Sequence, residues 1–426
     1  MSLTPEAYAL HLLQTLQCGG MAVASDGRPA DRLWAESGAM WLTGHADADP
    51  RACPAPLAAV AQGAWLALCA LTGGRLNPAA LDAHKLLGER AAIAGYSRQG
   101  RQSAGAACQL YDCADGVLAL NLARDDDRDL LPAWLEEDVT DESLADLLQQ
   151  RPLSLLLERG RLLGLAVAAV AAPETCTAWF GAKRYAEPVV PRKRVPLVID
   201  LSSLWAGPLC GQLLAQAGAR VIKVESEQRP DGARQGPTDF FDLMNDGKEC
   251  LSLPLHTAAG KAQLRTLILQ ADIVIEASRP RALEQMGIVA AELLQQKPGL
   301  VWLSLSGYGR AEPQRDWIAY GDDAGVAAGL SWLVGGDRGD PVFCGDAIAD
   351  PLTGLHAALL GWHDWQRGGG RLLELSLQQV VSFSIAAGSA DITGAYDVVP
   401  PQARPVLARA AALGADNPRL LQEFLP

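Results

Sequence analysis

The stretch LVIDLSSLWAGPLCGQLLAQAGARVIKVES, residues Leu197–Ser226, decides the predicted fold of this chain. Its opening, LVIDLSS, is apolar enough for a buried strand, and PLCGQLLAQAGA has the spacing of an amphipathic helix that ends at Gly218. The residues Arg220–Ser226 (RVIKVES) then predict a second strand. A strand, a helix and another strand joined by short turns are typical of a parallel sheet covered by helices.

The same alternation continues along the chain. Helices are predicted over Ala258–Gln270 and Ala290–Gln296, and an apolar strand follows each of them, at Asp272–Ser278 and at Leu300–Gly309. We therefore predict an α/β protein with a parallel sheet flanked by helices, a Rossmann-like core, and a second, smaller α+β part. The GYG at Gly307–Gly309 is not followed by GxGxxG, so the sequence lacks a dinucleotide-binding fingerprint.

The composition narrows the possible functions. A chain of 426 residues exceeds the usual size of one domain, so two or three domains are expected. The net charge of −13 argues against a nucleic-acid partner, which would require a basic surface. The longest apolar tract, Leu162–Ala172, is shorter than a membrane span and predicts a buried helix or strand, so no membrane association is expected.

Cysteine and histidine usage indicates a reducing compartment and no metal. The nine cysteines form no CxxC pair, which favours reduced thiols in a cytoplasmic protein over a disulfide framework or a zinc site. The N-terminal MSLTPEAYAL lacks the basic-then-apolar order of a signal peptide. His356 and His363 share a helix face, but no acidic or thiol partner completes a ligand set.

The chain contains an internal repeat. Ser37–Leu68 (SGAMWLTGHADADPRACPAPLAAVAQGAWLAL) aligns without a gap with Ala328–Leu359 (AGLSWLVGGDRGDPVFCGDAIADPLTGLHAAL). Both copies carry G-x-x-W-L-x-G, then D-P-x-x-C, then an apolar helix with a glycine at Gly63 or Gly354. One structural unit therefore occurs twice.

Asp350 lies at the start of the second copy's helix, in CGDAIADPLTGLHAALLG (Cys344–Gly361). Asp before Pro is a common helix start, because Asp caps the helix and Pro suits its first position. The matching residue of the first copy is Ala59, so this unit does not require the carboxylate for its fold. The sequence is therefore compatible with two interpretations of Asp350, as a helix cap and as a functional carboxylate.

These residues, taken together, resemble the family III CoA-transferases, the CaiB/BaiF family, which includes formyl-CoA transferase and α-methylacyl-CoA racemase. The resemblance covers about Val195–Ser382 and keeps the order of the family motifs. After the opening stretch come DLMNDGK (Asp242–Lys248), EASRPRALEQMG (Glu276–Gly287), SLSGYG (Ser304–Gly309), GLSWLVG, ADPLTGLHAAL and RGGGRLLELSL. It implies the family III CoA-transferase fold.

The N-terminal half resembles the family out of order. Ser37–Leu68 is similar to the family's middle segment, and Gly100–Arg124 (GRQSAGAACQLYDCADGVLALNLAR) is similar to its later segment. We therefore predict a partial transferase-like half without a nucleophile over 1–190, a CoA-binding and catalytic half over 195–390, and a C-terminal helical tail over 391–426. The arrangement implies either a homodimer or a pseudo-dimer within one chain.

The resemblance implies an activity: CoA moves between an acyl-CoA and a carboxylic acid through an aspartyl-CoA thioester, with Asp350 as the nucleophile. Asp346 is the nearby rival carboxylate, interpreted as a loop or hinge residue. Tyr320, the second candidate catalytic residue, stands where the family's racemases have a histidine, which disfavours the alternative of an acyl-CoA racemase or isomerase. A second alternative is a degenerate, non-catalytic CoA-binding subunit, since Ala59 replaces the carboxylate in one copy.

The resemblance also implies a CoA groove, with acyl-CoA and a carboxylate as small-molecule substrates and no tightly bound cofactor. Trp205 is expected either to stack on the adenine or to pack in the core. The groove departs from the family pattern at Ala277 and Ser278, and at Ser226 and Gln285, where formyl-CoA transferase has cations. The predicted CoA-binding residues are Leu204, Trp205, Ala206, Gly207, Pro208, Lys223, Ser226, Lys248, Leu253, His256, Ser278, Arg279 and Gln285.

Overall fold

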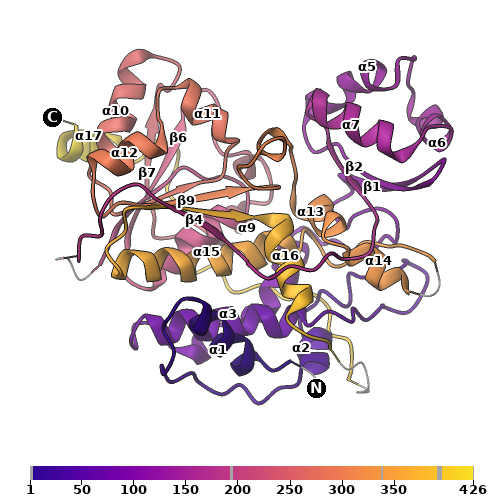
Figure 1. Ribbon diagram of the computed structural model, residues 1–426, viewed down its shortest axis with the longest axis horizontal. Helices are drawn as coiled ribbons and strands as arrows, with labels where there is room; N and C mark the ends of the chain where they lie inside the picture. The colour runs from indigo at the N-terminus through magenta and orange to yellow at the C-terminus, as the bar shows by residue number, and fades with distance from the viewer. Residues whose placement is uncertain (1–2, 192–194, 337–338, 391–395, 426) are drawn as a thin grey trace.

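A computed structural model describes residues 3–191, 195–336, 339–390 and 396–425. Within these residues, seven strands form one sheet in the order β4-β10-β9-β8-β5-β6-β7 (Figure 1). Neighbours from β10 to β7 run parallel, and β4 joins the edge antiparallel to β10. The strands are β4 (Gly181–Arg184), β5 (Leu197–Asp200), β6 (Arg220–Ser226), β7 (Glu249–Leu253), β8 (Ile273–Glu276), β9 (Val301–Ser306) and β10 (Arg371–Ser376).

The connections place a switch in strand order at the centre of the sheet. From β5 the chain moves outward to β6 and β7, then returns to β8 on the other side of β5 and continues to β9 and β10. This is the strand order of a doubly wound, Rossmann-like sheet, in which ligands bind where the order reverses. The predicted parallel sheet flanked by helices is confirmed.

Helices cover both faces of the sheet. One face packs against α8 (Ala206–Gln216) and α15 (Ala349–Gln366), and the other packs against α10 (Ala258–Ile268), α12 (Ala290–Gln296) and α17 (Asn417–Phe424). Strands β5 and β8 are buried along their whole length, as their apolar sequences predict. The predicted helices and strands of this half occur with ends shifted by a few residues.

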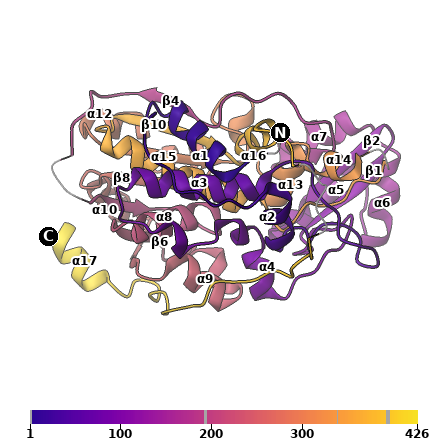
Figure 2. The same cartoon turned by 90° about the horizontal axis from the view of Figure 1, so that it is seen from below.

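The two copies of the repeat pack against each other. Helix α3 (Leu57–Leu71) occupies the place in the first copy that α15 occupies in the second, and the two helices are neighbours (Figure 2). The thiols of Cys53 and Cys344, which are equivalent in the repeat, touch. Contact between equivalent residues is what a local twofold relation produces.

Each repeat helix also packs on a second helix in the same way. A Cβ at Gly63 would lie 2.6 Å from the carbonyl oxygen of Pro5 in α1 (Pro5–Thr15), and a Cβ at Gly354 would lie 2.7 Å from that of Ala206 in α8. Glycine therefore lets two helix backbones approach closely at both places. The pair α1–α3 repeats the packing of α8–α15.

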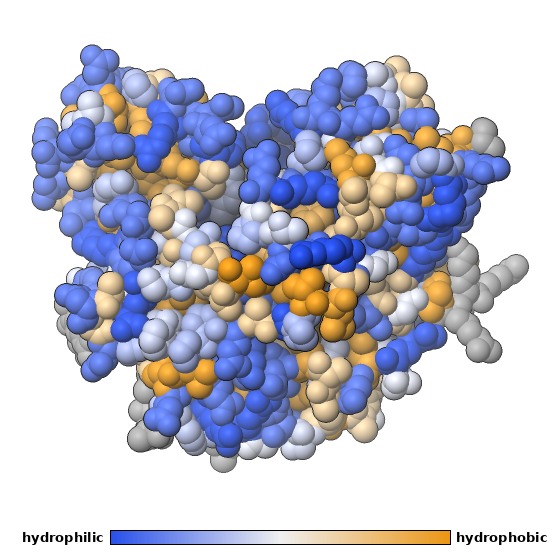
Figure 3. Space-filling view, turned by 180° about the vertical axis from the view of Figure 1, so that it is seen from behind, coloured by the Kyte–Doolittle hydropathy of each residue, from blue (hydrophilic) through white to orange (hydrophobic). Residues whose placement is uncertain are grey.

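A smaller α+β module lies to one side of the sheet (Figure 1). Its three-stranded antiparallel sheet has the order β1-β2-β3, and α5, α6 and α7 pack around a separate apolar core. The space-filling view shows a deep notch between this module and the sheet (Figure 3). Its elements are β1 (Cys108–Cys113), β2 (Gly116–Asn121), α5 (Leu131–Leu135), α6 (Asp141–Gln149), α7 (Leu153–Leu163) and β3 (Ala166–Ala169).

The prediction that Leu162–Ala172 forms one buried element is wrong. Helix α7 ends at Leu163, Gly164 turns the chain with φ +81°, and β3 begins at Ala166. Leu162 is 81% exposed, because it faces away from the module's core. No helix among the described residues is long and apolar enough to cross a membrane.

The remaining helical elements connect these parts. Beyond 396, the chain runs without regular structure until α17, whose Leu420 and Phe424 pack beside β7. The other elements are α2 (Ala30–Glu36), η1 (Pro78–Ala80), η2 (Ala83–Gly88), α4 (Glu89–Ala94), η3 (Asp125–Leu130), η4 (Gly232–Gln235), α9 (Thr238–Asn245), α11 (Pro280–Gln285), η5 (Gln314–Asp316), α13 (Gly321–Ala327), α14 (Leu330–Gly335) and α16 (Leu377–Ala386).

Candidate active site

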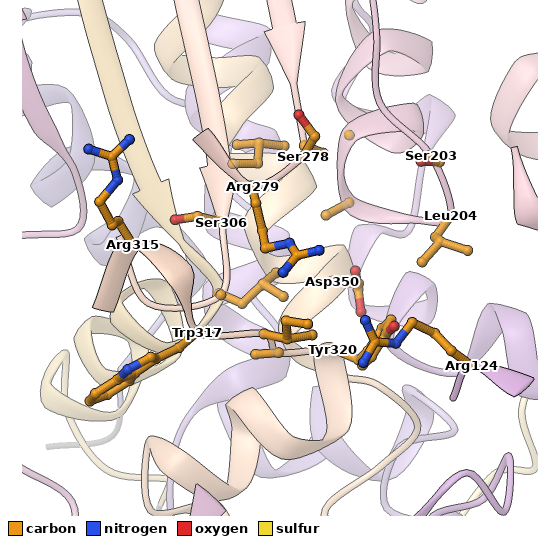
Figure 4. A pocket seen from close by; sticks show the side chains of 18 residues that line it. Arg124, Ser203, Leu204, Ser278, Arg279, Ser306, Arg315, Trp317, Tyr320 and Asp350 are labelled. Carbon is orange, nitrogen blue, oxygen red and sulfur yellow. The ribbon is translucent and has the colours of Figure 1, made fainter. Parts of the chain in front are cut away.

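A cavity of about 240 Å³ opens at the carboxyl ends of the parallel strands, where the strand order reverses (Figure 4). We call it the sheet-side cavity. Ser203 follows β5, Ser278 and Arg279 follow β8, and Ser306 ends β9, so the turns after three strands line it. The position agrees with the general rule for ligand sites in open α/β sheets.

Asp350 lies at the inner end of this cavity, in the first turn of α15. It does not cap its own helix, because Ile348 is the N-cap and makes no side-chain cap bond. Its carboxylate instead accepts a hydrogen bond from the backbone N–H of Ala206, at the start of α8. The N-terminus of α8 therefore faces the carboxylate, which favours its ionised form.

Gly321 makes room for this carboxylate. A Cβ at Gly321 would lie 2.5 Å from the carbonyl oxygen of Ala347 and still closer to Oδ2 of Asp350. Glycine at the start of α13 thus allows the carboxylate to sit against the backbone. The close-up shows Asp350 between Leu204, Tyr320 and Arg124 (Figure 4).

Burial raises the pKa of Asp350 to about 7. The positive charge of Arg90 opposes this shift, and the negative charges of Asp322 and Asp346 add to it. Arg90 forms a two-pronged ion pair with Asp346, with N–O distances of 2.9 and 2.5 Å. A carboxyl that titrates near neutral pH in a cavity is typical of a reactive group.

A second cavity, of about 510 Å³, meets the first at Asp350. We call it the aromatic chamber, because Tyr96, Trp205 and Phe240 are among the residues that line it. The two cavities share the side chains that surround the carboxylate. These shared residues are Arg124, Ser203, Leu204, Tyr320 and Asp350.

The loop between β5 and α8 is held in an unusual conformation. Leu204 has φ +69°, a backbone region that is strained for leucine, and its N–H donates to Asp231 at 3.0 Å. Lys223 donates to the same Asp231 at 2.8 Å and to the carbonyl oxygen of Ser202 at 2.9 Å. A buried ion pair thus fixes the loop that carries the N–H of Ala206.

Lys248 links the end of β5 to the first turn of α8 through hydrogen bonds. Its ammonium group donates to Asp200 at 2.8 Å, to the carbonyl oxygen of Pro208 at 2.8 Å and to Asn245 at 3.0 Å. These bonds use the three donors of the ammonium group, and its side chain is 1% exposed. The neighbouring cations Lys248 and Lys223 outweigh burial and lower the pKa of Asp200.

The structure brings some of the predicted site residues together and separates others. Leu204, Ala206, Gly207, Ser278, Arg279, Tyr320 and Asp350 line the sheet-side cavity, and Trp205 lines the aromatic chamber. Pro208, Lys223, Lys248 and Leu253 are buried outside both cavities, where the lysines form ion pairs. Ser226, His256 and Gln285 lie at the surface and line neither cavity.

Eight residues that line the aromatic chamber come from the N-terminal half and were not predicted, among them Arg90, Asn121 and Arg124. Asn121 and Arg124 end the segment Gly100–Arg124, whose likeness to the family's later segment was the signal that pointed there. Arg90 had no such signal, since its place beside Asp346 depends on packing between the two halves. In the described parts of the chain, no group of three or more His, Cys, Asp or Glu side chains could hold a metal ion.

Comparison with known proteins shows what the second half is similar to. Residues 196–390 match the model of CoA-transferase family III. Succinyl-CoA–D-citramalate CoA-transferase of Chloroflexus aurantiacus is 33% identical over 195 residues, 43% of this chain and 48% of that protein. Formyl-CoA:oxalate CoA-transferase of Escherichia coli is 32% identical over 197 residues, 43% of this chain and 47% of that protein.

The chain therefore spans about half the length of these curated relatives. A CAIB/BAIF family protein of known structure, from Brucella suis, is 28% identical, covers 44% of this chain and 53% of its own, and has a TM-score of 0.41. The resemblance predicted from the motifs of the second half is confirmed by the family match.

Proposed function

Since residues 196–390 form a CoA-transferase family III region, we propose that this chain moves CoA between an acyl-CoA and a carboxylic acid, with Asp350 as the nucleophile. One observation carries the proposal. The carboxylate of Asp350 lies where the sheet-side cavity and the aromatic chamber meet, on the N–H of Ala206, with its pKa raised to about 7 by burial. A poorly solvated carboxylate there can act as an anion near neutral pH.

The proposed reaction proceeds through two kinds of covalent bond to Asp350. The carboxylate attacks the thioester carbon of the donor, the C–S bond breaks, and a mixed anhydride and CoA thiolate result. The thiolate then attacks the aspartyl carbonyl carbon, which releases the donor acid and leaves an aspartyl-CoA thioester. The acceptor carboxylate repeats these steps in reverse and takes the CoA. No proton or electron is gained or lost over the cycle.

The sheet-side cavity is the proposed place for the pantetheine arm. It continues, through the shared residues Arg279 and Trp317, into a pocket of about 650 Å³ between the small module and the sheet. Burial and the nearby cations Arg281 and Arg124 lower the pKa of Arg279. Three arginines line this pocket together with three carboxylates, and the arginines are the candidate partners of the phosphates of CoA.

The covalent intermediate provides the test. Incubation with an acyl-CoA should give an aspartyl-CoA thioester that hydroxylamine converts to a hydroxamate and borohydride reduces. Peptide mass spectrometry should find the mark on Asp350. An enzyme that binds CoA and turns it over without a mark on any carboxylate would refute the mechanism, and binding without turnover would favour a non-catalytic CoA-binding subunit.

A pseudo-dimer within one chain is the proposed assembly, with the homodimer as its alternative. Helices α1 and α3 of the first half repeat the packing of α8 and α15, and Arg90 from the first half reaches the carboxylates of the second. We expect a mass close to one chain, 45.0 kDa, by light scattering at micromolar concentration. A stable mass of two chains that survives dilution would support the homodimer instead.

A further inference from the structure

We propose that the aromatic chamber selects a bulky, apolar acyl group, such as an aromatic or alicyclic one, and disfavours an acyl group that ends in a second carboxylate. The inference rests on the proposed transfer at Asp350 and names the class of its substrate. Three features of the chamber support this inference: the residues of its wall, its volume and the ion pairs that its arginines form.

The wall is suited to an apolar ring. Trp205 and Phe240 meet edge to face, with ring centroids 5.3 Å apart, and Tyr96 lies on the far side of Arg90. Small residues form much of the remainder and leave about 510 Å³ of space, far more than a formyl or acetyl group fills. These small residues are Ala94, Gly105, Ala107, Ala123, Gly232, Ala233 and Gly236.

The cations of the chamber are already paired. Among the described residues that line it, the positively charged ones are Arg90 and Arg124. Arg90 binds Asp346, and its guanidinium group lies 5.4 Å from the ring centre of Trp205. Arg124 binds Asp127 at 2.8 Å and the carbonyl oxygen of Gly164 at 2.7 Å. Neither guanidinium group therefore has a free edge with which it could form a bidentate ion pair with a ligand carboxylate.

The other polar groups of the chamber would repel a second carboxylate. Asp322 and Asp350 line the chamber, and Asp346 lies behind Arg90. Asn121 is 1% exposed; its amide donates to Asp323 at 2.8 Å, which leaves its carbonyl oxygen without a hydrogen-bond partner. A carbonyl oxygen can accept a hydrogen bond from a neutral ligand but cannot stabilise an anion. A distal carboxylate would therefore lose its water without gaining a counter-charge.

Unreactive thioethers separate this inference from the proposed function. Calorimetry on the wild-type chain should compare S-benzyl-CoA with S-(3-carboxypropyl)-CoA, with S-ethyl-CoA as the common reference. We expect S-benzyl-CoA to bind about tenfold tighter than S-ethyl-CoA, because a ring is buried, and S-(3-carboxypropyl)-CoA to bind more weakly than S-ethyl-CoA. Equal affinities for S-benzyl-CoA and S-(3-carboxypropyl)-CoA, or a preference for the carboxypropyl compound, would contradict this inference. The proposed CoA transfer at Asp350 would not be affected by that result. Failure of S-ethyl-CoA to bind would refute the proposed function.

A charge placed in the chamber wall gives a second test. Ala107→Arg adds a guanidinium group to the lining of the chamber, where it supplies a counter-charge for a ligand carboxylate, so the ratio of benzyl to carboxypropyl affinity should fall about tenfold. Ala107→Leu is the matched control, since it takes up space without charge and should lower the benzyl affinity without raising the carboxypropyl affinity. An arginine variant that folds, with an unchanged melting temperature, but keeps the wild-type ratio would contradict the proposed role of charge.

Discussion

Replacement of Asp350 by asparagine is expected to abolish CoA transfer while leaving CoA bound. Asparagine keeps the size of the side chain, but its amide cannot attack a thioester. The rate should fall by about 10³-fold or more, as is usual when a covalent nucleophile is removed. Steady-state transfer between an acyl-CoA and a carboxylic acid measures the rate, and calorimetry with S-ethyl-CoA measures the retained binding.

The same substitution is expected to stabilise the folded chain above neutral pH. The pKa of Asp350 is raised to about 7 in the folded state, whereas an unfolded aspartate titrates near 4. The folded chain therefore binds the extra proton between these values, and its stability falls as pH rises through that window. Above pH 7 the ionised carboxylate costs free energy, which asparagine avoids. We expect a gain of about 1–3 kcal/mol at pH 8, discounted for screening by water in the cavities, and almost none at pH 4.

Urea unfolding of the wild type and Asp350→Asn at pH 8 and pH 4 tests the stability prediction. Asp112→Asn is a control, since Asp112 is an exposed carboxylate in the small module, 58% exposed, and its loss should change neither activity nor the pH profile of stability. Transfer at a rate near the wild type by Asp350→Asn would remove Asp350 from the proposed mechanism. A loss of stability at pH 8 would show that the carboxylate is held favourably, against the burial argument.

Replacement of Lys248 by methionine is expected to cause the largest loss of stability. Lys248 is 1% exposed and Asp200 is 0% exposed, and each charge compensates the other at 2.8 Å. Removal of Lys248 takes away the hydrogen-bonded cation of the buried Asp200 and leaves Lys223 as the nearby positive charge, and loss of one partner from a buried pair costs about 3–5 kcal/mol. The free energy of unfolding, measured by urea titration, should fall by that amount. Binding of S-ethyl-CoA should weaken too, because Lys248 also holds the carbonyl oxygen of Pro208 in α8.

The double variant Lys248→Met/Asp200→Asn is the matched control for this pair. It removes both charges, so it should be more stable than Lys248→Met alone, and the double-mutant cycle should give a coupling above about 1 kcal/mol. Additive effects of the two substitutions would mean that the charges do not depend on each other. In that case the buried pair would not explain how the loop between β5 and α8 is held.

Local sequence predicted the elements of the second half well, because apolar periodicity and glycine position act over a few residues. Arg220–Ser226 and Ala290–Gln296 occur with the predicted bounds. The prediction failed for Leu162–Ala172, where composition suggested one buried element and Gly164 divides it. A mean apolar content does not reveal which side of a helix faces the core.

The sequence predicted the site residues that the resemblance to the family motifs marks, among them Asp350, Ala206 and Ser278. In the structure these three line one cavity, at the carboxyl ends of the parallel strands, where ligands bind in open α/β sheets. Lys223 and Lys248 are among the predicted CoA-binding residues, and the structure places both in buried ion pairs outside the two cavities. The partner of Lys248 is Asp200, 48 residues away in the sequence, and such a pairing depends on the fold and not on local spacing.

The sequence by itself determined the α/β architecture, the repeated unit and the asymmetry between Asp350 and Ala59, since each is recorded in periodicity or in residue identity. Tertiary structure alone decided that Arg90 from the first half pairs with Asp346 of the second, and that both arginines of the aromatic chamber are held in ion pairs. The physical reason is that electrostatic partners and cavity walls depend on distances across the fold, which chain order does not encode locally.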